Sequence, residues 1–338
     1  MTYQEIMENA RKNMGGFCNA CKECNGVVCK TKIPGPGAKG TGEVFQRNYA
    51  KLQEIKINLD TIFEDEPVDT SVELFGKKFR YPVFAAPIGA MKLHYGEMHD
   101  DITYNVELVA GCKDAGIAAF TGDGINPQVY DGALQSIKAA GGIGVPTIKP
   151  WDVELVKEKI RLAEEADAMA VATDIDASGL ALLKNVPTPV SPKSVTELRE
   201  ITQSTKLPVI VKGIMTVRGA LKALEAGVYG IVISNHGGRV LDQTPATVEV
   251  LPAIAQAVGG RMKIFIDGGI RTGLDVFKVL ALGADAVLIG RPYVTAVYGG
   301  GAEGAVIYTQ KVGTELAETM AMTGANKLSD INKEMLYL

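Results

Sequence analysis

A histidine and an arginine stand close together in the stretch Ser234-Asn235-His236-Gly237-Gly238-Arg239, directly after the apolar run 230–233. A histidine titrates near neutral pH and can act as a base, and the guanidinium fork of an arginine matches a carboxylate. The two glycines permit a sharp turn and a close approach of the backbone to a ligand. This pattern predicts a base, His236, and an anion anchor, Arg239, at the carboxyl end of a buried strand. The other two histidines, His94 and His99, lie in a stretch with few carboxylates and are expected to be structural.

Charged residues also follow other apolar runs. Lys212 closes the run 209–211, where an ammonium group either lies along the surface or stabilises negative charge on a cofactor or enolate. Two glycine-bearing turns, Asp267-Gly268-Gly269-Ile270-Arg271 and Gly290-Arg291-Pro292, come late in the chain. Backbone N–H groups and arginines at such turns are typical of a phosphate site.

Four of the five cysteines lie together near the N-terminus, at Cys18, Cys21, Cys24 and Cys29. In a chain without features of secretion, such a cluster favours metal or redox chemistry over disulfides. The first three have the spacing of iron–sulfur ligands, a four-cysteine zinc site is the alternative, and redox-active thiols are a third. The fifth, Cys112, follows Ala110-Gly111 in a helical pattern and is expected to be buried.

Short apolar runs recur along the rest of the chain, each followed by a turn and a helical pattern. The predicted strands are 83–86, 117–120, 143–148, 168–172, 209–211, 230–233, 264–266 and 286–289. Apolar residues at helical spacing fill intervening segments such as 194–202, 217–226 and 274–282. Eight strands that alternate with helices must pair in parallel. We therefore predict an α/β fold, a TIM barrel over 48–338, with a cysteine-rich N-terminal extension over 1–47.

Composition excludes several classes of function. The 338-residue chain has a formal net charge of −4, whereas proteins that bind nucleic acid usually present a basic face. Its apolar runs are of strand length and far shorter than a membrane span. The N-terminus lacks the basic start and apolar core of a signal peptide, and we expect a cytoplasmic protein.

The chain resembles the FMN-dependent α-hydroxy acid dehydrogenase/oxidase family, which includes glycolate oxidase, lactate oxidase and the flavin lactate dehydrogenases. The nine residues from Ser234 to Asp242 carry the resemblance most specifically, and Lys212-Gly213 and the two glycine turns agree with it. The likeness extends from about Asn48 to the C-terminus. It implies FMN-dependent oxidation of a small, lactate- or glycolate-like L-2-hydroxy acid to the 2-oxo acid.

The resemblance also implies roles for the matched residues. His236 would be the base, Arg239 the anchor of the substrate carboxylate, and Asp174 the carboxylate that orients the histidine. Lys212 would stabilise the reduced flavin. The residues expected to contact FMN are Ala86, Pro87, Ile88, Thr121, Lys149, Lys212, Ser234, Asp267, Gly268, Gly269, Arg271, Gly290 and Arg291, of which Arg271, Gly290 and Arg291 would hold the phosphate.

Two substrate contacts of the family are missing from the sequence. Lys149-Pro150-Trp151 stands where the family has a tyrosine, and no arginine occurs between Asp174 and Arg199 to serve as a second substrate arginine. Lys184 and Lys193 are the remaining candidates for a second anion contact, and neither duplicates a guanidinium fork.

These departures leave two alternatives to a hydroxy acid oxidoreductase. One is an FMN-dependent reductase or isomerase that acts on a different small anion, with the cysteines as an electron relay or structural metal site. The other is a metal- or redox-sensing module without enzymatic activity. The expected partners are the small-molecule substrate, a redox protein as electron acceptor, and further copies of the chain in a tetramer or octamer.

Overall fold

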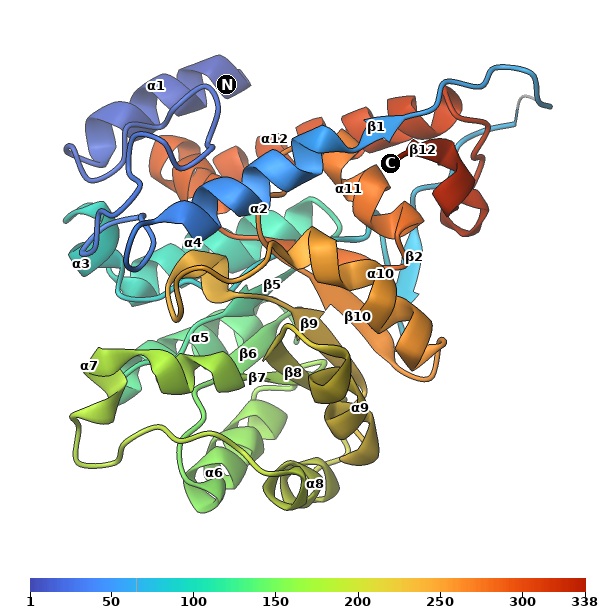
Figure 1. Ribbon diagram of the computed structural model, residues 1–338. Coiled ribbons are helices and arrows are strands. Elements are labelled where there is room, and N and C mark those ends of the chain that lie inside the picture. The colour runs from blue at the N-terminus through green and yellow to red at the C-terminus, as the bar shows by residue number, and fades with distance from the viewer. Residues whose placement is uncertain (65) are drawn as a thin grey trace.

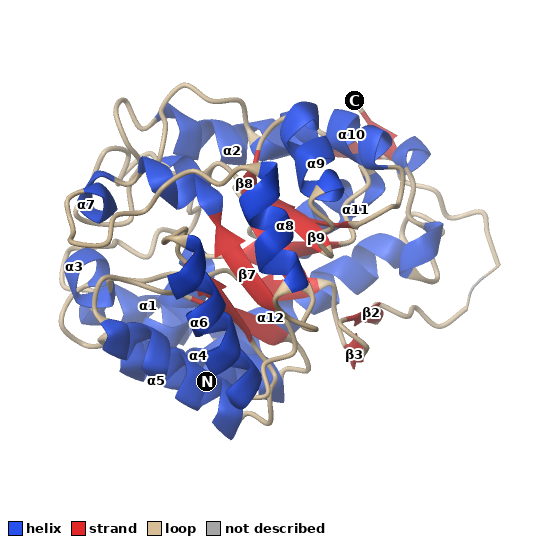
Figure 2. Ribbon diagram, turned by 90° about the horizontal axis from the view of Figure 1, so that it is seen from below, coloured by secondary structure: helices blue, strands red, loops and turns tan. Residues whose placement is uncertain are grey.

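The computed structural model describes residues 1–64 and 66–338. Eight short parallel strands form a closed barrel, in the order β10-β11-β4-β5-β6-β7-β8-β9, and β9 pairs with β10 to close it. The strands lie at the centre of the molecule with helices around them (Figure 2). Their bounds are β4 Val83–Ala85, β5 Ala118–Thr121, β6 Val145–Ile148, β7 Val171–Asp174, β8 Val209–Ile214, β9 Gly230–Ile233, β10 Lys263–Ile266 and β11 Ala286–Ile289.

The predicted TIM barrel is therefore confirmed, with all eight strands where the apolar runs indicated. The fourth strand differs most, because β7 extends to Asp174 whereas the apolar run ends at residue 172. The helices are α1 Tyr3–Asn13, α2 Glu43–Glu54, α3 Met91–Tyr95, α4 Asp101–Asp114, α5 Pro127–Ala139, α6 Val153–Glu165, α7 Ala181–Lys184, α8 Val195–Gln203, α9 Val217–Glu225, α10 Thr247–Val258, α11 Gly273–Ala281 and α12 Arg291–Ala321.

Side-chain caps fix where several of these helices begin. Before α8, Ser194 Oγ accepts a hydrogen bond from the backbone N–H of Glu197, and the Glu197 carboxylate accepts from the backbone N–H of Ser194. Thr272 and Asp275 form the same reciprocal pair before α11. Each pair satisfies backbone donors that a helix start leaves free. The loops after β7 and β10 are thereby held at their downstream ends.

The amino end of the barrel is closed by a hairpin, β2 Val72–Leu74 and β3 Lys77–Phe79. Its turn residue Phe75 stacks on Phe265 of β10 with ring centroids 5.8 Å apart, and Phe79 packs edge-on against Phe84 of β4. These aromatic side chains fill that end of the barrel core. A ligand can therefore approach the strands only from their carboxyl ends.

The N-terminal extension packs onto the barrel and does not form a separate body. Helix α1 lies against α12, where Tyr3 stacks on Tyr308 with centroids 6.0 Å apart. Gly299 permits the close approach, because a Cβ there would lie 2.1 Å from the carbonyl oxygen of Ile6. The predicted boundary between residues 47 and 48 falls inside α2, so this continuous helix spans both predicted units.

The chain after α1 lies on the same side of the molecule as α3 and α7 (Figure 1). Because α3 follows β4 and α7 follows β7, this side is the carboxyl face of the barrel. At the opposite end of the chain, the short strand β12 Leu336–Tyr337 pairs with β1 Lys56–Ile57. Within the described residues, the helices are too short or too polar to cross a bilayer.

Candidate active site

A buried network of hydrogen bonds and an ion pair joins the carboxyl ends of β8, β9 and β10. The ammonium of Lys212 donates to Ser234 Oγ over 2.8 Å and lies 3.3 Å from Asp267 Oδ2. Ser234 in turn donates to Asp267 Oδ2 over 2.9 Å. Burial lowers the pKa of Lys212, but the attraction of Asp267 and two further carboxylates outweighs it and raises the pKa above its usual value. Lys212 is therefore a fixed positive charge at the barrel mouth.

His236 begins a tight turn directly after β9 and Ser234. Its φ of +56° lies in the left-handed region, which costs a residue with a side chain about 1–2 kcal/mol. The backbone N–H of His236 donates to Ser234 Oγ over 3.0 Å, which holds the turn against the Lys212 network. Strain of this kind concentrates at functional sites, and here it aims the imidazole across the mouth toward β7.

The imidazole of His236 contacts Asp176, with Nδ1 3.0 Å from Asp176 Oδ1. The carboxylate fixes the N–H on Nδ1, so the lone pair of Nε2 is left to accept a proton. Burial raises the pKa of Asp176, but His236 and Lys212 more than compensate and lower the pKa below its usual value. Asp176 therefore stays ionised beside the histidine.

The structure places Asp176, and not the predicted Asp174, in hydrogen-bond contact with His236 Nδ1. Asp174 is the last residue of β7, and its carboxylate accepts a hydrogen bond from Lys149 Nζ over 2.7 Å. Asp176 lies in the 3-10 helix Ile175–Gly179, which carries the chain toward β8. Gly213 leaves the space for it, because a Cβ there would lie 2.5 Å from Asp176 Cγ.

Lys149 itself is held by Asp123, a buried carboxylate after β5. Asp123 accepts hydrogen bonds from the backbone N–H of Lys149 over 3.0 Å, from Trp151 Nε1 over 2.7 Å and from Lys159 Nζ over 3.1 Å. The loop after β6 is thus fixed, and it directs the Lys149 ammonium to Asp174. The sequence analysis did not single out Asp123, although an isolated carboxylate next to a barrel strand end was a signal for it.

Several buried polar atoms at the strand ends have no partner in the described part of the chain. They include the hydroxyls of Thr121, Thr147 and Thr173, at the ends of β5, β6 and β7, and one carboxylate oxygen each of Asp174 and Asp267. Buried polar groups are nearly always hydrogen-bonded. These atoms are therefore available to hydrogen-bond a polar ligand. Of the threonines only Thr121 was predicted, although a hydroxyl near the end of an apolar strand also marks the other two.

Comparison with known proteins agrees with this geometry. The family model described as FMN-dependent dehydrogenase matches residues 36–185 and 184–338, which together span most of the chain. The chain belongs to this family. The peroxisomal (S)-2-hydroxyacid oxidase GLO4 of Arabidopsis thaliana is 33% identical over 328 residues, covering 86% of each protein. L-lactate dehydrogenase (cytochrome) of Wickerhamomyces anomalus is 29% identical, covering 86% of this chain and 56% of that protein.

A crystal structure of mandelate oxidase superposes on this FMN-dependent dehydrogenase with a TM-score of 0.79. It is 25% identical in sequence and covers 99% of this chain and 97% of that one. The barrel and its extension are therefore shared almost throughout with a solved member of the fold.

The barrel mouth fits the polar edge of FMN. The free hydroxyls of Thr121, Thr147 and Thr173 and the ammonium of Lys212 offer donors and acceptors to a flavin ring. Ser234 is fully engaged, so it supports Lys212 and does not offer a free hydroxyl.

The predicted contacts Ala86, Pro87 and Ile88 lie at the same rim as Gly290. A Cβ on Gly290 would lie 3.2 Å from Ile88 Cδ1 and 3.7 Å from Ala86 Cβ. The backbone N–H of Ala86 is already used, because it donates to the carbonyl of Ile289 over 2.8 Å. The described geometry therefore places the apolar side chain of Ile88, beside Gly290, at this part of the mouth.

Two arginines of the mouth hold the N-terminal extension. Arg239 Nη1 donates to the carbonyl oxygens of Gly35 and Gly37 over 2.9 and 2.8 Å. Arg291 Nε donates to the carbonyl of Pro36 over 2.7 Å. The sequence analysis expected these groups at the substrate carboxylate and the cofactor phosphate. Those two roles stay predictions. The contacts in the structure give both arginines a further role, which is to hold residues 35–37 beside the mouth.

The third arginine contacts the cysteine segment. Arg271 Nε donates to the carbonyl of Cys24 over 2.9 Å, while its buried Nη2 has no partner among the described residues. Arg271 Nη2 therefore keeps a donor for an anion such as a phosphate.

Arg291 lies over the ring of Phe45, with its guanidinium carbon 3.7 Å from the centroid, and burial lowers the pKa of Arg291 to about 10.

Gly268 and Gly269, two of the predicted FMN contacts, lie against helix α2. A Cβ on Gly269 would lie 2.1 Å from the carbonyl oxygen of Asn48, and one on Gly268 would lie 3.1 Å from Asn48 Nδ2. Both glycines have φ above +80°. Their lack of side chains is explained by the close approach of α2, whether or not their backbone also faces the phosphate.

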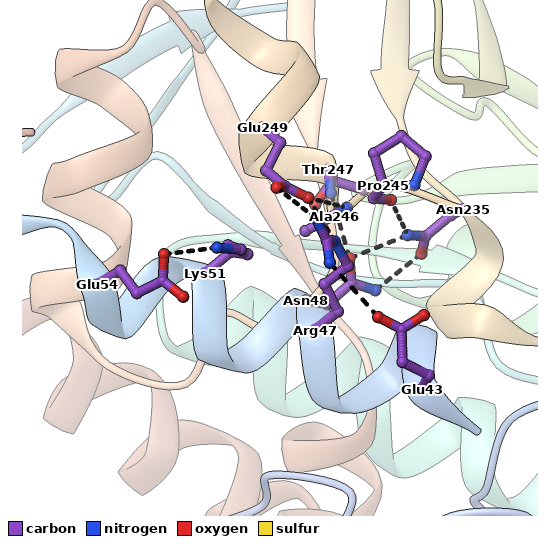
Figure 3. Close-up of polar contacts among 10 residues, drawn as sticks. All are labelled: Glu43, Arg47, Asn48, Lys51, Glu54, Asn235, Pro245, Ala246, Thr247 and Glu249. Carbon is purple, nitrogen blue, oxygen red and sulfur yellow. Dashed lines mark hydrogen bonds and ion pairs between the residues drawn. The ribbon is translucent and has the colours of Figure 1, made fainter. Parts of the chain in front are cut away.

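Helix α2 positions the histidine turn through a buried pair of amides (Figure 3). Asn48 Nδ2 donates to Asn235 Oδ1 over 2.8 Å, and Asn235 Nδ2 donates to Asn48 Oδ1 over 2.9 Å. Asn48 Oδ1 also accepts from the backbone N–H of Thr247 over 3.2 Å. Because Asn235 directly precedes His236, this pair sets the direction of the turn.

Asn48→Ala is expected to lower the free energy of unfolding by about 2–4 kcal/mol, because it leaves Asn235 Oδ1 and the Thr247 N–H buried without partners, while Asn235 Nδ2 keeps its bond to the carbonyl of Pro245. Urea unfolding followed by circular dichroism measures the change. Lys51→Ala is the matched control on the same helix, because its pair with Glu54 is exposed and should contribute less than about 1 kcal/mol. Equal stability of the two variants would contradict the positioning role of Asn48.

The four N-terminal cysteines line one cavity of about 380 Å³ between the extension and the loops after β10 and β11. All four are half-buried, and no three of their sulfurs lie within 4.8 Å of one another among the described residues. Burial raises the pKa of Cys18 to about 11, so its thiol is protonated at neutral pH. Cys112 is buried in α4, as expected.

The histidines expected to be structural differ in their surroundings. His99 is buried against Tyr298, with ring centroids 5.0 Å apart. His94 lies between the extension and the mouth: its Nδ1 accepts from the backbone N–H of Gly35 over 3.0 Å, and its Nε2 lies 3.1 Å from Arg239 Nη2. Burial and the charge of Arg239 lower the pKa of His94 to about 4, so its ring is neutral.

Proposed function

We propose that this chain oxidises a small (S)-2-hydroxy acid to the 2-oxo acid with FMN as its cofactor. The observation that carries the proposal is the His236–Asp176 pair, held in a strained turn beside the buried cation Lys212. Oxidation of an alcohol removes two protons and two electrons, and it requires a base, which the unpaired Nε2 of His236 supplies, next to a fixed positive charge. Membership in the FMN-dependent dehydrogenase family supports the same reaction.

In this mechanism His236 Nε2 accepts the proton that the hydroxy acid releases. Asp176 keeps the imidazole in the required tautomer and stabilises its protonated form. When bound, FMN would supply the acceptor for the two electrons and for the second hydrogen that the hydroxy acid loses. Lys212 stabilises the negative charge that the cofactor gains, and Arg239 is proposed to bind the substrate carboxylate through donors that residues 35–37 leave free.

Lys149 takes the place of the family's tyrosine. Its ammonium is paired with Asp174, and the Lys149 side chain is only 14% exposed. We propose that this pair, together with the free oxygen of Asp174, forms the polar wall against the substrate or the flavin. Lys184 and Lys193 follow β7, and neither contacts this pair in the hydrogen bonds and ion pairs described.

The proposal is tested by anaerobic mixing of the FMN-loaded protein with glycolate, L-lactate, L-mandelate and their available D-enantiomers. At least one L-acid is expected to bleach the visible absorbance of the flavin, and its D-enantiomer is not. Dithionite, which reduces any accessible flavin, is the positive control. If dithionite bleaches the flavin and no hydroxy acid does, the substrate class is wrong.

The electron acceptor, the assembly, the location and the cysteine ligand are proposals too. Relatives of this chain include both proteins named oxidases and one named lactate dehydrogenase (cytochrome), so a redox protein is an acceptor consistent with the family. We propose a homo-oligomer, a tetramer or octamer, in the cytoplasm. The four cysteines are proposed to bind a metal, for which iron–sulfur and zinc are the candidates.

A further inference from the structure

The cavity lined by the four cysteines lies outside the barrel mouth, and the reaction proposed above does not use it. Cys18, Cys21, Cys24 and Cys29 all reach it from the loop that follows α1. Cys112, the remaining cysteine, lies apart from it in α4. The cysteines of the extension thus converge on a single space, which points to a common ligand.

We propose that these four cysteines ligate an iron–sulfur cluster of the [4Fe–4S] type. In tetrahedral zinc the Zn–S distance of about 2.3 Å brings all four sulfurs to within about 4 Å of one another. A cubane cluster spreads its thiolates farther, because each sulfur binds a different iron atom. Among the described residues no three of the sulfurs come within 4.8 Å of one another, while all four line the same cavity. A cavity of about 380 Å³ has room for a cluster, and the spacing of Cys18, Cys21 and Cys24 is that of iron–sulfur ligands, so the site suits the cluster better than a single zinc ion.

The charges around the cavity suit an anionic cluster. Lys22, Lys32, Lys311, Arg271 and Arg291 line it together with one carboxylate, that of Glu23. A cluster with four thiolates carries a net negative charge, and nearby cations stabilise it most where water is excluded. Arg271 is anchored beside this cavity, because its Nε donates to the carbonyl of Cys24.

The loop is held in shape by groups other than the cysteines. Arg11 donates to the carbonyls of Asn19 and Ala20, each over 3.0 Å, and Arg271 donates to that of Cys24. Ala20 has a φ of +40°, which turns the chain between the first two cysteines. These contacts hold the cysteine loop against the cavity without involving the cysteine sulfurs.

The place of the cavity implies a role, which rests on the proposed function. Arg271 and Arg291 follow β10 and β11, so the cavity adjoins the predicted phosphate end of the FMN site. Oxidation of one hydroxy acid releases two electrons and two protons. The electrons would pass one at a time through the cluster to two molecules of an oxidised one-electron carrier protein, and the protons to water. The enzyme is then a dehydrogenase and does not consume oxygen.

Analysis of anaerobically purified holoprotein tests the site without any substrate. We expect about four iron and about four acid-labile sulfide per chain, with an electron paramagnetic resonance signal after reduction by dithionite. One zinc per chain without sulfide, or four free thiols without metal, would overturn the proposal. Because this readout involves no hydroxy acid, it can fail while the flavin is bleached by substrate, or succeed while the flavin is not.

Variants then connect the cluster to the cysteines. Cys21→Ser and Cys24→Ser are each expected to lose most of the iron and the reduction of oxidised cytochrome c by hydroxy acid. Cys112→Ala, the matched control, is expected to keep both. FMN content and circular dichroism are measured alongside, so that a variant that fails to fold is recognised. In that case the metal analysis of the wild-type protein decides whether the cluster is present. Full iron content in both serine variants would overturn the assignment of these ligands.

Discussion

His236→Asn is expected to slow the reduction of bound FMN by a 2-hydroxy acid by roughly 10²–10⁴-fold, the usual contribution of a positioned general base. Asparagine keeps a polar side chain of similar reach and tolerates the left-handed backbone that residue 236 requires. It cannot accept the substrate proton at neutral pH. Anaerobic stopped-flow spectroscopy of the FMN-loaded variant measures the rate directly.

His99→Asn is the control for this variant. His99 is buried against Tyr298 and has no contact with Asp176 or Lys212 among the described interactions. The FMN of the His99→Asn variant is expected to be reduced by the hydroxy acid at nearly the wild-type rate. An unchanged rate in His236→Asn would rule out His236 as the base of the mechanism.

The barrel could be predicted from the sequence because its signals are local. Each strand is a short apolar run with a turn after it, and each crossover helix carries its own periodicity. The run Gly230–Ile233 followed by Ser234 was enough to place the histidine turn at a strand end. Family membership followed from the same motifs, because a nine-residue match is specific.

The partner of His236 could not be predicted, because long-range contacts decide it. Asp174 and Asp176 are two residues apart, and either could face the histidine if β7 ended earlier or later. The strand extends to Asp174 since it pairs with Lys212 of β8 in register. A register shift between Lys212 and Ile214, with Gly213 between them, then makes room for Asp176. Nothing near Asp174 in the sequence encodes that space.

The roles of the arginines were also beyond the sequence. Arg239 and Arg291 contact carbonyl oxygens in residues 35–37, which are about 200 and 255 positions away along the chain. A carbonyl acceptor leaves no trace in residue type, since every residue carries one. The glycine- and proline-rich stretch 34–37 carries no polar side chain that would signal this role, and the structure shows it as a backbone ligand for two guanidinium groups.

Asp176→Asn is expected to reduce the rate of flavin reduction by about 10²–10⁴-fold, comparable with the loss seen when an aspartate behind a catalytic histidine is replaced. The asparagine amide can donate to Nδ1, which moves the imidazole N–H to Nε2 and removes the lone pair that faces the substrate. The pKa of Asp176 is lowered by His236 and Lys212, so the native carboxylate stays charged as pH falls. The defect arises from the tautomer and not from protonation, and raising the pH should not restore the rate.

Asp174→Asn separates the two carboxylates at the end of β7. It weakens the pair with Lys149 but leaves Asp176 on His236, so its main effect should be on substrate affinity, with a rate loss well below that of Asp176→Asn. Steady-state kinetics report the split, because KM rises when ground-state binding is lost and kcat falls when the base is misoriented. If Asp174→Asn lost the rate and Asp176→Asn kept it, the catalytic carboxylate would be Asp174 after all. The contact between Asp176 and His236 would then be structural.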